Sequence, residues 1–183
     1  MSGEQLYGSC VNCHDPAGEG RPADGVPRIA GMPTWYLASQ LQRFQDGLRG
    51  KHPDDFEGLR MRAMARQMMS AAEIDAVAEY IAAMPKVTNT ASQTGADAAA
   101  GQAIFVRCSA CHGLKGEGNQ PLNAPPLAGL DDWYVERQLR KFRAGVRGKA
   151  AGDLVGPAMQ AMSLTLQPGE IATIAAYVHS LPR

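Results

Sequence analysis

The pentapeptide Cys-x-x-Cys-His occurs twice, and it constrains this chain more than any other feature. It reads Cys-Val-Asn-Cys-His at residues 10–14 and Cys-Ser-Ala-Cys-His at residues 108–112, which together use all 4 cysteines. This spacing is the attachment signal for c-type haem, because the two thiols bond to the porphyrin and the adjoining histidine ligates the iron. The sequence therefore predicts two covalently bound haem c groups. The predicted attachment residues are Cys10, Cys13, Cys108 and Cys111, and the predicted iron ligands are His14 and His112.

Zinc binding and dithiol redox chemistry are the alternative interpretations of a Cys-x-x-Cys pair. A structural zinc site gathers four ligands in one place, usually as two close pairs. Here the two Cys-x-x-Cys pairs lie 98 positions apart along the chain, from Cys10 to Cys108. A thioredoxin-like motif requires a βαβ setting, and the period-two alternation of β-strands is absent from this sequence.

Composition narrows the class of protein. The 183 residues allow one or two small domains, and 45% hydrophobic with 20% charged residues is typical of a folded globular chain. The formal net charge of +0 gives no basic field for nucleic acid, so partner docking is expected to depend on local patches. No apolar run reaches the length of a membrane span, which leaves peripheral association as the mode of membrane contact. No signal peptide is visible; because haem attachment normally follows export, we expect that a leader was removed or lies outside this chain.

The 98-position shift superimposes the two halves almost without gaps. The matched segments are Gly18-Glu19-Gly20 with Gly116-Glu117-Gly118, Trp35-Tyr36 with Trp133-Tyr134, Gln40-Leu41 with Gln138-Leu139, and Arg49-Gly50-Lys51 with Arg147-Gly148-Lys149. Two large copies indicate a tandem domain pair rather than a solenoid. We predict domains at residues 1–85 and 97–183, joined by a Thr-, Ser-, Asn- and Gly-containing linker at 86–96.

Helical periodicity indicates an all-α fold with substantial coil. A middle helix is predicted from the spacing of Leu37, Leu41, Phe44 and Leu48, and of Val135, Leu139, Phe142 and Val146. Gly50 and Gly148 are the expected stop signals of these helices. The last helix of the first half is expected after a Ser70–Glu73 capping box, and Pro168 is expected in the first turn of its counterpart. Their apolar stripes are interpreted as core packing.

The opening helix is clearer in the second half, where Asp97 is a suitable cap for Ala98 to Val106. The first half matches the second only from Gly3 onward, which predicts a shortened opening helix.

The sixth iron ligand is predicted from the repeat. The two remaining histidines are not duplicated. His52 aligns with Ala150, and His179 aligns with Ala82, because one residue drops out after the methionines and the shift there is 97 positions. Met61 aligns with Met159, and Met64 aligns with Met162, so methionine is the expected ligand if both domains share one chemistry.

Between the two methionine pairs, local sequence favours Met61 and Met159. Pro157 predicts a non-helical stretch before Met159, and an extended loop suits a ligand that reaches across a haem face. Met64 and Met162 remain the fallback ligands. Met68 and Met69 lack a methionine counterpart and are assigned to packing.

Other duplicated residues are candidates for the haem environment. Arg49 and Arg147 are each followed two positions later by a lysine, and we hypothesise that they neutralise haem propionates, the alternative being a solvated helix end. The aromatic candidates are Trp35, Tyr36, Trp133 and Tyr134, for which core packing is the simpler interpretation. The carbonyls of Pro27 and Pro125 are expected to orient the proximal imidazoles.

The order of these motifs resembles cytochrome c4. The resemblance rests on Cys-x-x-Cys-His, Gly-Glu-Gly, Pro-x-x-Ala-Gly, Trp-Tyr-x-x-x-Gln-Leu, the Met-x-x-Met segment and a final helix ending in Ala-x-Tyr, and it spans nearly the whole chain. It implies two class I cytochrome c domains related by a pseudo-twofold axis, His/Met ligation, a periplasmic location and electron transfer. It also implies that the first methionine of each pair, Met61 or Met159, is the ligand. The His52–Asp55 segment is noted as having no equal in the second half.

Three functions are compatible with a chain that carries two haem c groups. The first is an electron carrier between a quinol-oxidising respiratory donor and a terminal oxidase or other periplasmic acceptor. The second is an electron-delivering cytochrome subunit of a larger oxidoreductase. The third is a dihaem peroxidase, which requires an open iron position and is disfavoured by the matched methionines.

Overall fold

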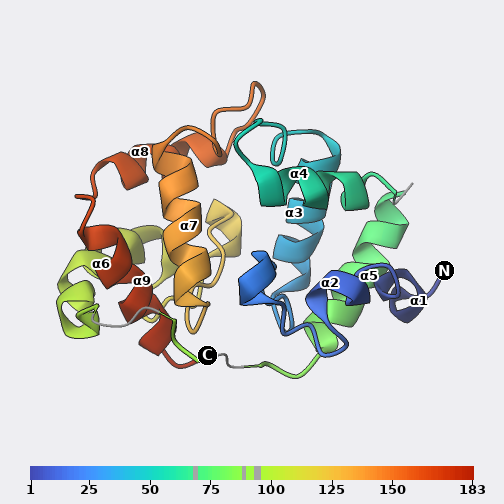
Figure 1. Cartoon of the computed structure of the whole chain (residues 1–183), viewed down its shortest axis with the longest axis horizontal. Helices are drawn as coiled ribbons and strands as arrows, with labels where there is room; N and C mark the ends of the chain where they lie inside the picture. The colour runs from blue at the N-terminus through green and yellow to red at the C-terminus, as the bar shows by residue number, and fades with distance from the viewer. Residues whose placement is uncertain (68–69, 88–89, 93–95) are drawn as a thin grey trace.

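Two helical domains follow one another along the chain in the computed structural model (Figure 1), which describes residues 1–67, 70–87, 90–92 and 96–183. The first domain contains α1 (Gly3–Tyr7), α2 (Val11–His14), a 3₁₀ turn (Pro22–Asp24), α3 (Thr34–Gln45), α4 (Phe56–Ala65) and α5 (Ala71–Ala83). The second contains α6 (Ala98–His112), a 3₁₀ turn (Gln120–Leu122), α7 (Asp132–Arg143), α8 (Gly156–Leu164) and α9 (Glu170–Ser180). The all-α prediction is confirmed. The only β-type pairing within the described ranges is a duplicated isolated bridge, Arg21 with Val26 and Asn119 with Ala124.

The opening helix differs between the domains as expected. In the second domain α6 is continuous and carries its haem motif at the C-terminal end, with the predicted Asp97 accepting from the backbone N–H of Ala100 at 3.0 Å. In the first domain the same region is divided into α1 and α2 by a turn at residues 8–10. Ser2 begins α1 with a complete capping box to Gln5, so this short helix has its own start signal.

The opening and closing helices cross closely in each domain. A side-chain carbon at Gly101 would lie 2.5 Å from the carbonyl oxygen of Thr173, and one at Gly3 would lie 2.2 Å from that of Ala76. Such distances are far below a van der Waals contact, so only glycine permits the crossing. The predicted core stripes are confirmed for Ile74, Val77, Ala78 and Ile81 of α5 and for Ile171, Ile174, Ala175 and Val178 of α9, which are all buried. Met84, also predicted in the first stripe, follows the last residue of α5 and is only partly buried.

The predicted ends of the middle helices were wrong by about one turn. α3 ends at Gln45 and α7 at Arg143, so Leu48 and Val146 lie beyond the helices. The chain leaves each helix at Gly47 and Gly145, which adopt φ values of 74° and 72° that favour glycine. Gly50 and Gly148 instead lie against the backbone at the start of α4 and α8.

The closing helices start differently from each other. The Ser70–Glu73 capping box is confirmed at α5. α9 begins at Glu170 with Gly169 as its cap, so Pro168 precedes the helix instead of occupying its first turn. Met68 and Met69, assigned to packing from sequence, lie outside the described residues.

The two domains face each other through α3 and α7, with α4 and α8 across one end of this pair (Figure 1). Ser92 of the predicted linker is attached to the second domain, because it donates to both carboxylate oxygens of Asp132 at 2.6 and 2.7 Å. Buried Arg28 of the first domain donates to the carbonyl of Gly129 in the second. Linker residues 88–89 and 93–95 lie outside the described residues. No helix within the described ranges is long and apolar enough to cross a membrane.

Candidate haem sites

Each motif histidine is held by a backbone carbonyl thirteen residues further along the chain. His14 Nδ1 lies 2.9 Å from the carbonyl oxygen of Pro27, and His112 Nδ1 lies 2.8 Å from that of Pro125. A carbonyl only accepts, so Nδ1 carries the proton and the lone pair of Nε2 is left for a metal. The expectation that these proline carbonyls orient the imidazoles is confirmed by the hydrogen bonds.

Burial shifts the pKa values of the motif histidines and of Cys108. Burial lowers the pKa of His14 and of His112, which keeps both imidazoles neutral as ligands require. Burial raises the pKa of Cys108 to about 11, opposite in direction to the depressed pKa of a reactive dithiol. Within the described residues, no three His, Cys, Asp or Glu side chains cluster as a metal site.

The two methionine pairs lie on helices, contrary to the extended loop predicted from Pro157. Met61 and Met64 belong to α4, and Met159 and Met162 belong to α8. Pro157 occupies the first turn of α8, where its missing N–H has no intrahelical partner to lose. Because residues three apart share a helix face, both members of each pair border the same cavity.

Hydrogen bonding distinguishes the members of each pair. Gln67 donates to the thioether of Met64 at 3.7 Å, and Thr165 donates to the thioether of Met162 at 3.7 Å. These two contacts occupy matched positions, since the 98-position shift carries Gln67 onto Thr165. Among the described hydrogen bonds, none engages the sulfur of Met61 or Met159. The assignment of Met61 and Met159 as ligands stays a prediction.

A cavity of about 490 Å³ connects the two domains, and its lining includes the motif cysteines and histidines and all four of these methionines. Of the four aromatic candidates, Tyr36, Trp133 and Tyr134 line the cavity, whereas Trp35 does not and instead packs edge-on against Tyr36 at 5.7 Å. The indole N–H of Trp133 is buried without a hydrogen-bond partner. A buried donor beside an apolar cavity fits a group that brings its own carboxylates, as haem does with its propionates.

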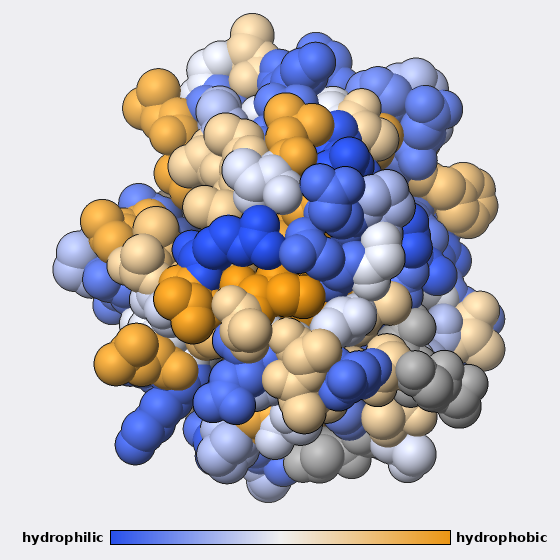
Figure 2. All heavy atoms as spheres, turned by 90° about the vertical axis from the view of Figure 1, so that its left-hand side faces the viewer, coloured by the Kyte–Doolittle hydropathy of each residue, from blue (hydrophilic) through white to orange (hydrophobic). Residues whose placement is uncertain are grey.

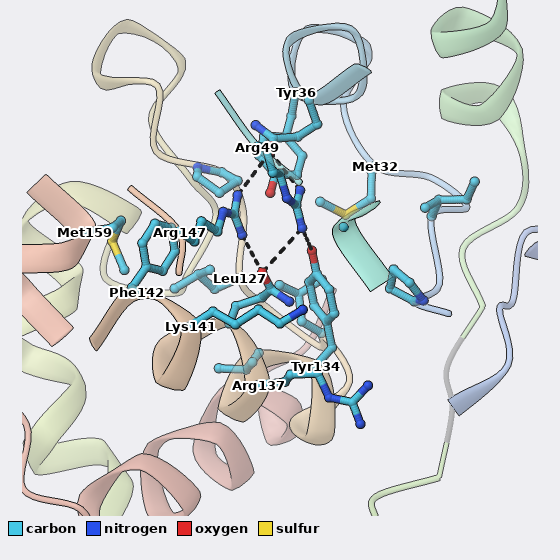
Figure 3. Close-up of a pocket in the computed structure, with 18 of the residues that line it drawn as sticks. Met32, Tyr36, Arg49, Leu127, Tyr134, Arg137, Lys141, Phe142, Arg147 and Met159 are labelled. Carbon is cyan, nitrogen blue, oxygen red and sulfur yellow. Dashed lines mark hydrogen bonds between the residues drawn. The ribbon is translucent and has the colours of Figure 1, made fainter. Parts of the chain in front are cut away.

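The two domains exchange hydrogen bonds through a duplicated arginine–glutamine network (Figure 3). Arg49 donates to Gln40 Oε1 of its own domain at 2.8 Å and to Gln138 Oε1 of the other at 3.3 Å. Arg147 repeats the pattern, donating to Gln138 Oε1 at 2.8 Å and to Gln40 Oε1 at 3.0 Å. Arg49 also donates to the hydroxyl of Tyr134 at 3.0 Å. Both arginines thus lie at the domain junction, and the repeat relates the two halves of the network.

Positive charge is concentrated in this arginine–glutamine network, at Arg49 and Arg147. Burial and the neighbouring charge of Arg49 lower the pKa of Arg147. Burial tends to raise the pKa of Tyr134, but the charges of Arg49 and Arg147 outweigh it and lower that pKa. The hydrogen bonds that the structure gives these two arginines go to amide and hydroxyl oxygens. Two facing cations held by neutral acceptors are suited to receive anionic groups.

Sequence reasoning missed a set of ion pairs between the domains. Lys141 of α7 binds Asp55 Oδ1 at 2.5 Å and Glu57 Oε2 at 2.6 Å, and Arg137 binds Glu57 Oε1 at 2.8 Å. In the opposite direction, Arg43 of α3 binds Asp153. The 98-position shift carries Arg43 onto Lys141 and Asp55 onto Asp153, so the repeat itself held this signal. The view that the His52–Asp55 segment has no equal in the second half was therefore wrong for Asp55.

Comparison with known proteins places these features in a family context. The cytochrome c family model matches residues 1–85 and 98–182. A thiosulfate dehydrogenase electron acceptor from Thiomonas intermedia is 33% identical over 95% of this chain and 79% of its own length. A cytochrome c4 from Azotobacter vinelandii is 27% identical over 98% of this chain and 88% of its own length. Among solved structures, the thiosulfate dehydrogenase TsdBA from Marichromatium purpuratum superposes with a TM-score of 0.81 at 31% identity, and the match covers 98% of this chain but 40% of that chain.

Proposed function

This chain belongs to the cytochrome c family as a tandem pair of cytochrome c domains close to cytochrome c4, and from that premise we propose that it links a respiratory electron donor to a terminal acceptor in the periplasm. It is a dihaem c-type cytochrome that carries electrons. The donor we propose is a quinol-oxidising complex, and the acceptor a terminal oxidase or another periplasmic oxidoreductase. The periplasmic assignment follows from covalent haem attachment, which normally takes place after export.

Bound haem c supplies reversible one-electron Fe(III)/Fe(II) chemistry. Within each domain, the chain holds the proximal imidazole as a neutral ligand through the proline carbonyl, at His14 and at His112. We assign the second axial position to Met61 and Met159, with Met64 and Met162 as the alternative. A thioether ligand would stabilise the reduced iron and fill the position opposite the histidine, which would favour electron transfer over oxygen or peroxide chemistry.

The observation that carries this proposal is the duplication of a complete ligand set on both sides of one junction. Each domain has a carbonyl-oriented histidine, a helical methionine pair and an arginine in the shared network. We propose that Arg49 and Arg147 receive haem propionates at this junction and that the Trp133 indole donates to one of them. A peroxidase would instead require one iron position that is open or easily opened.

Exposed apolar side chains favour the second domain as a docking site for a redox partner. They include Val106, Leu114, Leu122 and Leu154, with exposed fractions from 54% to 94%. At the matched positions the first domain has Gly8, Pro16, Asp24 and Phe56, of which only Phe56 is a large apolar residue. Figure 2 shows the side of the molecule formed by the second domain, where apolar side chains are interspersed with polar ones. Leu114 follows the haem motif by two residues, so a partner that contacts Leu114 lies close to that motif.

A second candidate function is that of a cytochrome subunit that takes up electrons from one catalytic partner and passes them on. It is favoured by the 33% identical relative described as a thiosulfate dehydrogenase electron acceptor. The two functions differ in the donor, so stopped-flow reduction of the oxidised dihaem protein separates them. Fast reduction by a quinol-oxidising complex, with slow reduction by thiosulfate dehydrogenase plus thiosulfate, supports the respiratory carrier. The reverse order of rates supports the catalytic partner.

A further inference from the structure

The N-termini of the two methionine-bearing helices are each held by an aspartate. Asp55 caps α4, where its Oδ1 accepts from the backbone N–H of Gly58 at 3.1 Å. Asp153 precedes α8, where its Oδ1 accepts from the backbone N–H of Val155 at 3.0 Å and of Gly156 at 2.7 Å. A carboxylate in this position satisfies free backbone donors and interacts favourably with the helix dipole. Both aspartates thereby fix where the following helix begins.

The cation that pairs with each aspartate comes from the other domain. Lys141 on α7 of the second domain binds Asp55 of the first at 2.5 Å. Arg43 on α3 of the first domain binds Asp153 of the second. The side chains of Asp55 and Asp153 are 3% and 0% exposed, and both cations are 13% exposed. Removing either cation would leave a buried carboxylate without its charge partner, which is a strong perturbation.

Space at these helix starts is too small to absorb a movement of the aspartates. A side-chain carbon at Gly58 would lie 2.1 Å from Asp55 Oδ2, and one at Gly156 would lie 2.2 Å from Asp153 Oδ2. Each carboxylate is therefore packed directly against the first turn of its helix. A displacement of the carboxylate is transmitted to the helix. It therefore reaches the two methionines, which follow the first-turn glycine by three and six residues.

We propose that Asp55 and Asp153 are positioning residues through which each domain sets the methionine-bearing helix of the other domain. The coupling is crossed: Lys141 of the second domain supports Met61 of the first, and Arg43 of the first supports Met159 of the second. This inference rests on the proposed ligation by Met61 and Met159. In this way the position of each methionine depends on an ion pair with the other domain, although the two iron sites share no ligand.

The two junctions differ in the ion pairs that surround the aspartate. Glu57 adds a second carboxylate to Lys141 and is itself paired with Arg137. The 98-position shift matches Glu57 with Val155 and Arg137 with Ser39, so Arg43 and Asp153 act without this reinforcement. The Arg43–Asp153 junction is consequently the one that a single substitution disrupts more completely.

The test measures how readily imidazole displaces each axial methionine in the full-length ferric dihaem protein. The NMR methyl signals of the two ligating methionines are followed separately, after assignment with Met61→His and Met159→His. We expect Lys141→Met to lower the imidazole concentration that displaces Met61 by roughly fivefold, the equilibrium equivalent of one lost capping interaction, and to leave Met159 unchanged. Arg43→Met is expected to do the reverse.

Three further variants make the result specific. Lys141→Arg should restore wild-type behaviour, and Asp55→Asn should reproduce the Met61 effect while keeping an oxygen for Gly58. Arg140→Met is the matched control, because Arg140 adjoins Lys141 on α7 but pairs with Glu136 of its own helix. An effect confined to the variant's own domain, an equal effect on both methionines, or no effect would overturn the crossed coupling. If the wild-type protein itself lacks two methionine signals, the proposed ligation is wrong instead.

Discussion

Arg49 of the first domain donates a hydrogen bond to the hydroxyl of Tyr134 in the second domain at 3.0 Å. The contact joins two residues 85 positions apart in the sequence and places a partly buried cation at the domain junction. It shows that the arginine singled out by the repeat serves the interface rather than a solvated helix end. The same arginine is available to an anionic group that enters the cavity beside it.

Removal of either junction arginine is expected to lower a haem reduction potential. If Arg49 or Arg147 lies beside a propionate, its positive charge favours the reduced, less positive iron. Arg49→Gln should lower one potential by roughly 60 mV, which corresponds to a tenfold change for a one-electron couple. Potentiometric titration of the two haems measures the shift, and Arg140→Gln, which removes an exposed arginine of α7 paired with Glu136, is the control. Unchanged potentials in Arg49→Gln and Arg147→Gln would contradict the proposed role.

Substitution of single methionines should separate ligands from packing residues. Met61→Ala is expected to remove half of the weak far-red band that reports methionine bound to ferric iron, and Met159→Ala the other half. Met64→Ala and Met162→Ala should keep the full band, while the loss of partly buried side chains lowers stability by about 1–3 kcal/mol. Loss of the band in the Met64 or Met162 variants would reverse the ligand assignment.

The helix crossing in the second domain should be intolerant of a methyl group. Gly101→Ala would place a carbon 2.5 Å from the Thr173 carbonyl oxygen and is expected to reduce the free energy of unfolding by roughly 1–3 kcal/mol. Gly169→Ala is a matched control, because a carbon there meets nothing within 4 Å. Denaturant unfolding measures both variants. Equal stabilities would show that the crossing is not as close as described.

Acid should weaken the domain junction at Asp153. Burial tends to raise the pKa of this carboxyl, but hydrogen bonds from Arg43 and from backbone N–H groups outweigh it, so the folded-state pKa lies below 3.8. A depressed pKa means that the stabilisation is fully present above the unfolded-state value near 4 and is lost as the pH falls through the folded value. Thermal unfolding between pH 6 and pH 2 should show this loss. Asp153→Asn should be less stable at pH 6 and show a smaller decrease, and an unchanged profile would argue against the ion pair.

The sequence predicted the parts of this protein that depend on local spacing. The haem motifs, the proximal histidines, the Ser70 and Asp97 caps and the buried stripes of the closing helices follow from residues close together in the chain. Methionine was predicted as the second ligand from the duplication, because chance rarely places the same residue at matched positions of a repeat. The carbonyl partners of His14 and His112 were also predictable, since Pro27 and Pro125 are part of the repeat.

Features that depend on long-range geometry were predicted less well. Pro157 was interpreted as a helix breaker, yet its effect depends on whether it falls in the first turn, which the structure places at Gly156. Gly47 and Gly50 are both compatible with a helix end and both have a positive φ, and only the end of α3 at Gln45 in the structure identifies the first as the exit. The crossed pairs Arg43–Asp153 and Lys141–Asp55 required knowledge of how the domains face each other, which no local pattern contains.

The most direct test of the account is an optical spectrum of the oxidised and reduced protein with haem quantified against polypeptide. Two haems per chain, both low-spin and both showing the methionine-to-ferric-iron band, are the predicted result for a dihaem electron carrier. One haem without that band, or a high-spin iron that binds cyanide or peroxide readily, would contradict His/Met ligation in both domains. A protein without covalent haem would contradict the account at its foundation.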